Sequence, residues 1–248
     1  MPSRWRLGVW GACVTGGLAL VVGVLTVGLG AAPHAVGDSS SHAPTAAVAA
    51  KSLVATINSA GAQGSRFPSG PSVREVPGGW YGAPSVLPVI GRQPGWAEVR
   101  VAQRPNGTTT WVPDRDVSLA SDPYHIVIDL DSMRLQLFYD GKVVRSFPAG
   151  VGISAAPTPT GSFFVAFLAR APSPAYGAFV IVTSAHSNTI SDWEESGDAI
   201  TAIHGPLGAD ALIGRTGARI SHGCIRLHDA DLAQLRDVPA GTPIDIVG

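Results

Sequence analysis

The chain has 248 residues, with 17 Lys or Arg against 18 Asp or Glu, so its net charge is −1 at pH 7. From Ser121 onward, 8 basic residues stand against 13 acidic ones. A chain with this balance of charges has no excess of basic residues to form the positive surface that nucleic-acid binding requires. Nucleic acid is therefore excluded as a partner.

The first 32 residues predict a membrane segment. Arg4 and Arg6 precede 26 uncharged residues, from Leu7 to Ala32. A run of roughly 20 apolar residues can cross a bilayer as a helix, and basic residues stay on the inner side. A cleaved signal peptide is the alternative, but its apolar core is usually shorter and a proline follows the small residues here. We expect segment 1–32 to anchor the chain, with the remainder extracytoplasmic.

Residues 33–65 are rich in Ala, Ser, Gly and Pro and contain few large apolar side chains. Such a composition buries too little surface to offset the entropy of ordering the backbone. The sequence therefore predicts a flexible, disordered linker over 33–65.

Residues 66–121 consist of short β-rich runs separated by turn residues. Strands are expected over 85–90, 96–103 and 108–113, and Asn106-Gly107 is a strong hairpin signal. The spacing of Gly-Trp, Asn-Gly and Trp-Val in this segment resembles the small SH3-like β-barrels that accompany bacterial cell-wall enzymes. The resemblance implies a wall-binding or positioning β-module. A packing domain without a ligand is the alternative.

Residues 122–248 predict a mostly β domain with little helix. Strands are expected over 125–130, 134–140, 142–150, 161–169, 177–184, 199–205 and at the C-terminus, with a tight turn at Asp140-Gly141. One helix is expected, with Asp229 as its N-cap and Arg236 near its end. The polar stretch 184–198 suits a lid over a cleft, in which Trp193 would touch substrate.

Cys224 is the one cysteine outside the apolar N-terminal run, where Cys13 lies. An unpaired cysteine in an exported chain indicates either intermolecular pairing or a reactive thiol. His204 is followed by 16 residues and then by Ser221, His222, Gly223 and Cys224. A thiol attacks as the thiolate, so a neighbouring imidazole that takes its proton suits acyl transfer. A glycine beside the nucleophile lets backbone N–H groups approach an oxyanion.

With these residues, the region from Tyr124 to Gly248 resembles the YkuD-type catalytic domain of the L,D-transpeptidases, enzymes of bacterial peptidoglycan synthesis. The family motif is a His, a gap of similar length, and then Ser/Thr-His-Gly-Cys, an apolar residue and Asn or Arg. Here the last two positions are Ile225 and Arg226. The run "PTPTGSF" at 157–163 and the closing strand also match the family. The implied fold is a β-rich YkuD-type domain behind the β-module.

The resemblance implies a role for each motif residue. Cys224 would be the nucleophile, and His204 the general base, oriented by the carbonyl of Gly205. Some members have a Ser at that position, so only a backbone role carries over to Gly205. His222 would assist the incoming amine on the acceptor side.

Four further residues complete the expected site. The N–H groups of Gly223 and Cys224 would form the oxyanion hole, and Ser221 and Arg226 would brace the loop. Tyr176 lies where the family has an aromatic residue beside the donor cleft, although a packing role fits it equally well.

The implied activity is formation of 3→3 peptidoglycan cross-links from stem peptides, with no metal or cofactor. The resemblance also implies inhibition by β-lactams, especially carbapenems. A cysteine-dependent L,D-carboxypeptidase or hydrolase is the alternative, as is a non-enzymatic wall-binding protein with a structural Cys/His loop.

Two enzyme classes fit the sequence less well. His204, His222, Cys224 and His228 could in principle bind zinc, but no pair has the tight spacing of common zinc motifs. In Cys–His hydrolases of the NlpC/P60 kind the cysteine precedes the histidine, which is the reverse of the order here. His125 and His186 lack any such context and are assigned no role.

Overall fold

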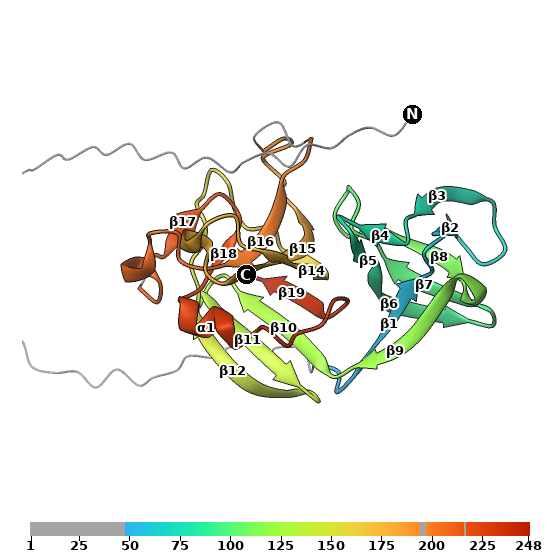
Figure 1. The fold of residues 1–248 in the computed structure, drawn as a ribbon, viewed down its shortest axis with the longest axis horizontal. Helices are drawn as coiled ribbons and strands as arrows, with labels where there is room; N and C mark the ends of the chain where they lie inside the picture. Colours follow the sequence, from blue (N-terminus) through green and yellow to red (C-terminus); the bar gives the residue numbers. More distant parts are fainter. Residues whose placement is uncertain (1–47, 194–196, 216) are drawn as a thin grey trace, which may run out of the picture.

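The computed structural model describes residues 48–193, 197–215 and 217–248, and they form two β-rich bodies side by side (Figure 1). The mostly β fold predicted from the sequence is confirmed. The predicted membrane segment 1–32 and the first part of the predicted linker lie outside these residues. Within the described ranges, no helix is long and apolar enough to cross a membrane.

The N-terminal module, residues 52–122, is built on an antiparallel sheet with the order β3-β2-β8-β7-β6-β1-β9. Its strands are β1 Ser52–Ile57, β2 Ala62–Ser65, β3 Ser72–Val76, β6 Val86–Gln93, β7 Trp96–Arg100, β8 Thr109–Pro113 and β9 Val117–Asp122. A small hairpin, β4 Gly79–Trp80 and β5 Ala83–Pro84, and a 3₁₀ turn, Asp114–Asp116, complete it.

The prediction of a disordered linker as far as residue 65 is wrong for residues 52–65. Strand β1 pairs with β6 on one side and with β9 on the other, which places it inside the sheet. The run "SLVATI" supplies Val54, Ala55 and Ile57, all at least 95% buried. These apolar side chains offset the ordering entropy that the surrounding Ala- and Gly-rich composition does not.

The strands predicted around Asn106-Gly107 are confirmed as the antiparallel pair β7 and β8. Their connection spans residues 101–108, so these two residues do not form a two-residue hairpin turn. Gly107 has a φ of 82°, a left-handed conformation that glycine adopts without a steric penalty.

The C-terminal domain, residues 124–247, contains a second sheet with the order β12-β11-β10-β19-β14-β15-β16-β18. Its strands are β10 Tyr124–Asp129, β11 Arg134–Tyr139, β12 Lys142–Pro148, β14 Gly161–Arg170, β15 Phe179–His186, β16 Ile200–His204, β18 Ile225–Arg226 and β19 Pro243–Val247. Strands β13 Val151–Gly152 and β17 Arg219–Ser221 form a separate pair, and Pro174–Tyr176 and Asp210–Leu212 are 3₁₀ turns.

The predicted turn between β11 and β12 is confirmed, because Asp140 and Gly141 both have positive φ, 48° and 72°. This is the backbone that a two-residue turn of type I′ requires. The predicted helix exists but is shorter, as α1 Asp229–Ala233. Asp229 is its first residue and not its N-cap, which is His228 without a side-chain capping bond.

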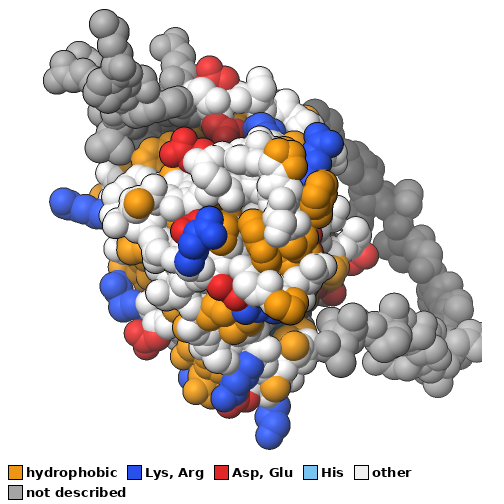
Figure 2. All heavy atoms as spheres, turned by 90° about the vertical axis from the view of Figure 1, so that its right-hand side faces the viewer, with side chains coloured by type: hydrophobic (Ala, Val, Ile, Leu, Met, Phe, Trp, Pro, Cys, Tyr) orange, Lys and Arg blue, Asp and Glu red, His pale blue; other side chains and the backbone are white. Residues whose placement is uncertain are grey.

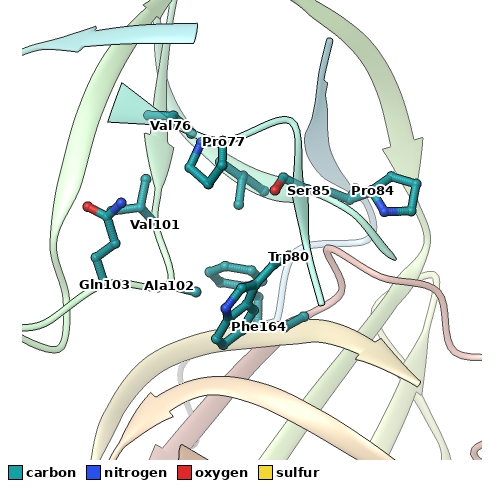
Figure 3. A pocket seen from close by; sticks show the side chains of 12 residues that line it. Val76, Pro77, Trp80, Pro84, Ser85, Val101, Ala102, Gln103 and Phe164 are labelled. Carbon is teal, nitrogen blue, oxygen red and sulfur yellow. The ribbon is translucent and has the colours of Figure 1, made fainter. Parts of the chain in front are cut away.

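Strand β14 joins the two bodies, because its side chains alternate between two cores. Phe163 and Val165 belong to the core of the C-terminal domain. Phe164 and Ala166 point the other way and are buried with the apolar residues of the N-terminal module. A cavity of about 130 Å³ lies at this junction, where Trp80 approaches Phe164 (Figure 3). The module therefore packs on the C-terminal sheet through a common core.

The face of the molecule on the module's side carries hydrophobic side chains in patches between polar ones (Figure 2). Its Lys and Arg side chains stand apart from one another and form no continuous stripe on this face.

Candidate active site

Two adjacent parallel strands bring His204 and Cys224 to one place. Strand β16 ends at His204 and pairs with β18, with Ile203 opposite Ile225 and His204 opposite Arg226. Cys224 comes directly before β18, two residues from Arg226, so the start of β18 places it beside β16. A backbone hydrogen bond between Ala202 and the Cys224 thiol supports this register.

The His204 ring is held in one orientation. Its Nδ1 donates a hydrogen bond to the Gly205 carbonyl oxygen at 2.8 Å, the contact expected from the resemblance. Since a carbonyl only accepts, the neutral ring carries its proton on Nδ1, and Nε2 keeps a lone pair. The residue is only 2% exposed, and the Tyr176 ring lies 4.8 Å from it between centroids. His204 is thus preset to accept a proton at Nε2.

Burial favours the neutral forms of both groups. It lowers the pKa of His204 to about 4, with the Gly205 carbonyl opposing the shift and Arg226 adding to it. Burial also raises the pKa of the Cys224 thiol, against the opposing effects of the Ala202 backbone and Arg226. The resting pair is therefore a thiol and a neutral imidazole, and the proton moves only when the thiol reacts.

Ser221 closes the loop that carries Cys224. Its hydroxyl donates to the Cys224 carbonyl at 2.6 Å and accepts the Gly223 N–H at 3.1 Å. Gly223 has a φ of 120°, which a side chain would strain. Because its N–H is bonded to Ser221, the expected oxyanion role of Gly223 does not fit this structure. Of that expected pair, the Cys224 N–H remains the candidate donor to an oxyanion.

Thr158 is a buried brace for which the sequence reading assigned no role. Its hydroxyl donates to the Gly223 carbonyl at 2.9 Å and accepts the Gly152 N–H at the same distance. The residue is 3% exposed. The signal for it was the run "PTPTGSF", in which it is the first threonine. One hydroxyl thus fastens the Cys224 loop to the segment that precedes β14.

Gly205 permits a close approach of its backbone to the backbone of Tyr176 and Gly177. Its N–H donates to the Tyr176 carbonyl at 2.8 Å. A Cβ at this position would lie 2.5 Å from the Asp229 carboxylate and 2.8 Å from the Gly177 nitrogen. This site has no room for the serine of other family patterns. Tyr176 is therefore placed beside His204 by a backbone contact that requires glycine.

Arg226 lies close to the thiol and the Tyr176 side chain. Burial lowers the pKa of its guanidinium, while the charges of Cys224 and Tyr176 raise it. The hydrogen bond from its Nη1 to the Pro206 carbonyl is long, at 3.5 Å. Its buried Nε has no partner among the residues that the structure describes. Its clearest physical effect is a positive charge that stabilises a Cys224 thiolate.

His222 is exposed, unlike His204. The Trp193 ring is 5.5 Å from the His222 ring between centroids, at an angle of 46°. The polar stretch between β15 and β16 thus contacts the Cys224 loop at His222.

His228 is hydrogen-bonded to Asp210, at 2.7 Å between Nδ1 and Oδ1. In the described part of the chain, no three His, Cys, Asp or Glu side chains are grouped so that they could hold a metal. The four residues considered as zinc ligands are therefore not gathered into one site.

The chain matches the model of the YkuD family, the L,D-transpeptidase catalytic domain, over residues 123–246. Over 125 residues it is 30% identical to YkuD of Bacillus subtilis and 28% identical to YkuD of Bacillus licheniformis, both assigned as L,D-transpeptidases. Each match covers 50% of this chain and 66% of the relative, which is just under two thirds of the relative's length.

Solved structures of low identity are also similar. An L,D-transpeptidase from Mycobacterium smegmatis is 21% identical with a TM-score of 0.40, covering 64% of this chain and 80% of that one. L,D-transpeptidase 3 from Mycobacterium tuberculosis, in complex with a faropenem-derived adduct, is 17% identical with a TM-score of 0.41. That match covers 66% of this chain and 91% of the other.

Proposed function

The chain belongs to the L,D-transpeptidase (YkuD) catalytic-domain family, and from this premise we propose that it forms 3→3 peptidoglycan cross-links through a thioacyl intermediate on Cys224. The observation that carries the proposal is the preset His204. Its Nδ1 is bonded to the Gly205 carbonyl, and its strand lies next to the one that follows Cys224. This is the arrangement that a nucleophile and its base require.

In the first half-reaction, Cys224 Sγ attacks the carbonyl carbon before the terminal D-Ala of a tetrapeptide stem. The thiol proton passes to His204 Nε2, and the oxyanion accepts the Cys224 N–H. When the C–N bond breaks, the His204 proton moves to the departing amine of D-Ala. A neutral starting pair suits this sequence, because the imidazole takes up and returns one proton within the step.

In the second half-reaction, a side-chain amine of a neighbouring stem attacks the thioester carbon. The amine gives up a proton, the C–S bond breaks, and the Cys224 thiol is restored. His222, which is exposed and lies two residues before Cys224, serves this step. By family resemblance, the donor carbonyl belongs to meso-diaminopimelate. Neither half-reaction calls for a metal or an organic cofactor.

The remaining parts of the proposal concern placement. The N-terminal segment anchors the chain in the membrane or is a cleaved signal, and the catalytic domain works on the extracytoplasmic side. The N-terminal module, which we interpret as SH3-like, binds or orients the enzyme on the wall. Family resemblance also supports inhibition by carbapenems.

The test is product analysis with the purified full-length chain in detergent and synthetic tetrapeptide stems. We expect free D-Ala and a stem dimer whose mass equals two stems minus D-Ala. Cys224→Ala, checked for folding by circular dichroism, should give neither product. A tripeptide without dimer would make the enzyme a carboxypeptidase, and a dimer formed by folded Cys224→Ala would refute the mechanism.

A further inference from the structure

The β7–β8 connection of the N-terminal module, residues 101–108, contacts the segment between β15 and β16 of the catalytic domain. This segment, residues 187–199, is described except for 194–196 and leads to Trp193. Two side chains of the β7–β8 connection, Arg104 and Asn106, form hydrogen bonds with this part of the catalytic domain. A module outside the family domain therefore touches a segment that borders the candidate site.

Arg104 binds three points of the β15–β16 segment. Its Nε donates to Asp198 Oδ1 at 2.9 Å, and Nη2 makes an ion pair with the same oxygen at 2.8 Å. Its Nη1 donates to the Ser187 carbonyl at 2.9 Å, and Nη2 donates to the Ile190 carbonyl at 3.2 Å. A planar guanidinium with several fixed donors suits such a multiple contact, which a lysine does not reproduce.

Asn106 takes the place of a neighbouring strand. Its Nδ2 donates to the His186 carbonyl at 2.7 Å, and its Oδ1 accepts the His186 N–H at 2.9 Å. The same Nδ2 donates to the Asn188 side chain at 3.2 Å. The amide thus binds both backbone groups of the last residue of β15, where the β15–β16 segment begins.

The fixed segment leads directly to the candidate site. Asp198 lies 2.7 Å from His186 Nδ1, so the two ends of the segment are tied together. The backbone N–H of Trp193 donates a hydrogen bond to the backbone carbonyl of Asp198 at 2.9 Å. The Trp193 ring lies against the exposed His222 ring. The contacts therefore run from Arg104 through Asp198 and Trp193 to His222.

We propose that Arg104 and Asn106 are positioning residues for the acceptor half-reaction, acting through Trp193 on His222. This inference rests on the proposed transpeptidase function. The N-terminal module then contributes directly to the acceptor side, in addition to any role in wall binding. Acylation of Cys224 uses His204. Among the residues that the structure describes, the hydrogen bond and the ring contact of His204 are with Gly205 and Tyr176, both in the catalytic domain.

The experiment compares two arginine variants of the full-length chain. Arg104→Ala removes the contact between the module and the segment. Arg92→Ala is the matched control, because Arg92 forms an ion pair with Asp114 inside the module. The side chains of Arg92 and Asp114 are 39% and 33% exposed, and those of Arg104 and Asp198 are 40% and 31% exposed. Acylation by the donor stem and transfer to an amine are measured separately by rapid quench and mass spectrometry.

We expect Arg104→Ala to slow transfer on the order of tenfold, as a small misplacement of a catalytic group does, with acylation changed less than twofold. Arg104→Lys should recover little of the transfer rate, and Arg92→Ala should match the wild type. Equal slowing of both half-reactions, or equal transfer rates in the two alanine variants, would overturn the inference.

A double-mutant cycle with Trp193→Ala tests the route. If Arg104 acts through Trp193, removing Arg104 from the Trp193→Ala enzyme should cost no further transfer activity. Additive losses would refute this route. A wild-type enzyme that never acylates would instead defeat the proposed function, so the two failures can be told apart.

Discussion

At the residue scale, His204 is suited to act as the base for Cys224, because its ring is buried, oriented and neutral. We predict that His204→Ala slows acylation of Cys224 by about 10² to 10⁴-fold, the usual contribution of a positioned base. The measurement is the single-turnover rate with a donor stem. His125→Ala is the control, since it removes a partly buried histidine bonded to Asp245. Normal acylation by the His204 variant would remove His204 as the base.

Because the pKa of His204 is lowered in the folded chain, the free energy of unfolding should depend on pH. The pKa of His204 is about 4 in the folded chain, against 6.5 for a free histidine, so below pH 6.5 the unfolded chain binds a proton that the folded chain does not. The free energy of unfolding should therefore fall as pH drops from 6.5 to 4, by about 3 kcal/mol from this group. Burial also lowers the pKa of His186, in the same direction.

Urea unfolding at pH 7, 5.5 and 4 measures this dependence. His204→Ala should show a shallower loss of stability across that range than the wild type does. Identical pH profiles for the two proteins would mean that the His204 ring is not buried in its neutral form.

The spacing of a short motif predicts Cys224 as the nucleophile and His204 as its base, because such chemistry depends on residue types that lie near one another in the motif. It did not predict that Gly223 gives its N–H to Ser221, since a bond between neighbouring groups depends on loop geometry. It also could not reveal Arg104, whose partner Asp198 is 94 positions away. No local pattern encodes such a contact.

At the scale of elements, the Cys224 loop is held to the preceding segment by the Thr158 hydroxyl. We predict that Thr158→Val lowers the free energy of unfolding by about 2–4 kcal/mol, because two buried backbone groups lose their partner. Chemical denaturation of the two proteins measures this difference in the free energy of unfolding. Thr160→Val, an exposed threonine of the same run, should change it by less than about 0.5 kcal/mol. Equal effects of the two substitutions would show that the Thr158 bonds contribute nothing.

The elements themselves were largely predictable where one physical signal dominated. Asp140-Gly141 gave the β11–β12 turn because only a few residue types accept two positive φ angles. Composition misled over 52–65, where a six-residue apolar strand was hidden among small residues. Strand β1 forms because β6 and β9 flank it, and such long-range pairing is not visible in a local window.

At the scale of the whole molecule, β14 links the two bodies because Phe164 is buried among module residues. We predict that Phe164→Ala lowers the free energy of unfolding by about 3–5 kcal/mol, and that both bodies still unfold in one calorimetric transition. Leu168→Ala on the same strand, at 36% exposure, should cost about 1 kcal/mol or less. Two separate transitions in the wild type would contradict a common core.

The central claim, acyl transfer through Cys224, is tested most directly by intact-protein mass spectrometry after incubation with excess carbapenem. A β-lactam ring presents a strained amide to the nucleophile and keeps its leaving group attached, so the acyl-enzyme accumulates. The account predicts one added carbapenem mass per chain, on the peptide that contains Cys224, and none after prior alkylation of that thiol or in Cys224→Ala. An unchanged mass, or an adduct on a serine, would contradict it.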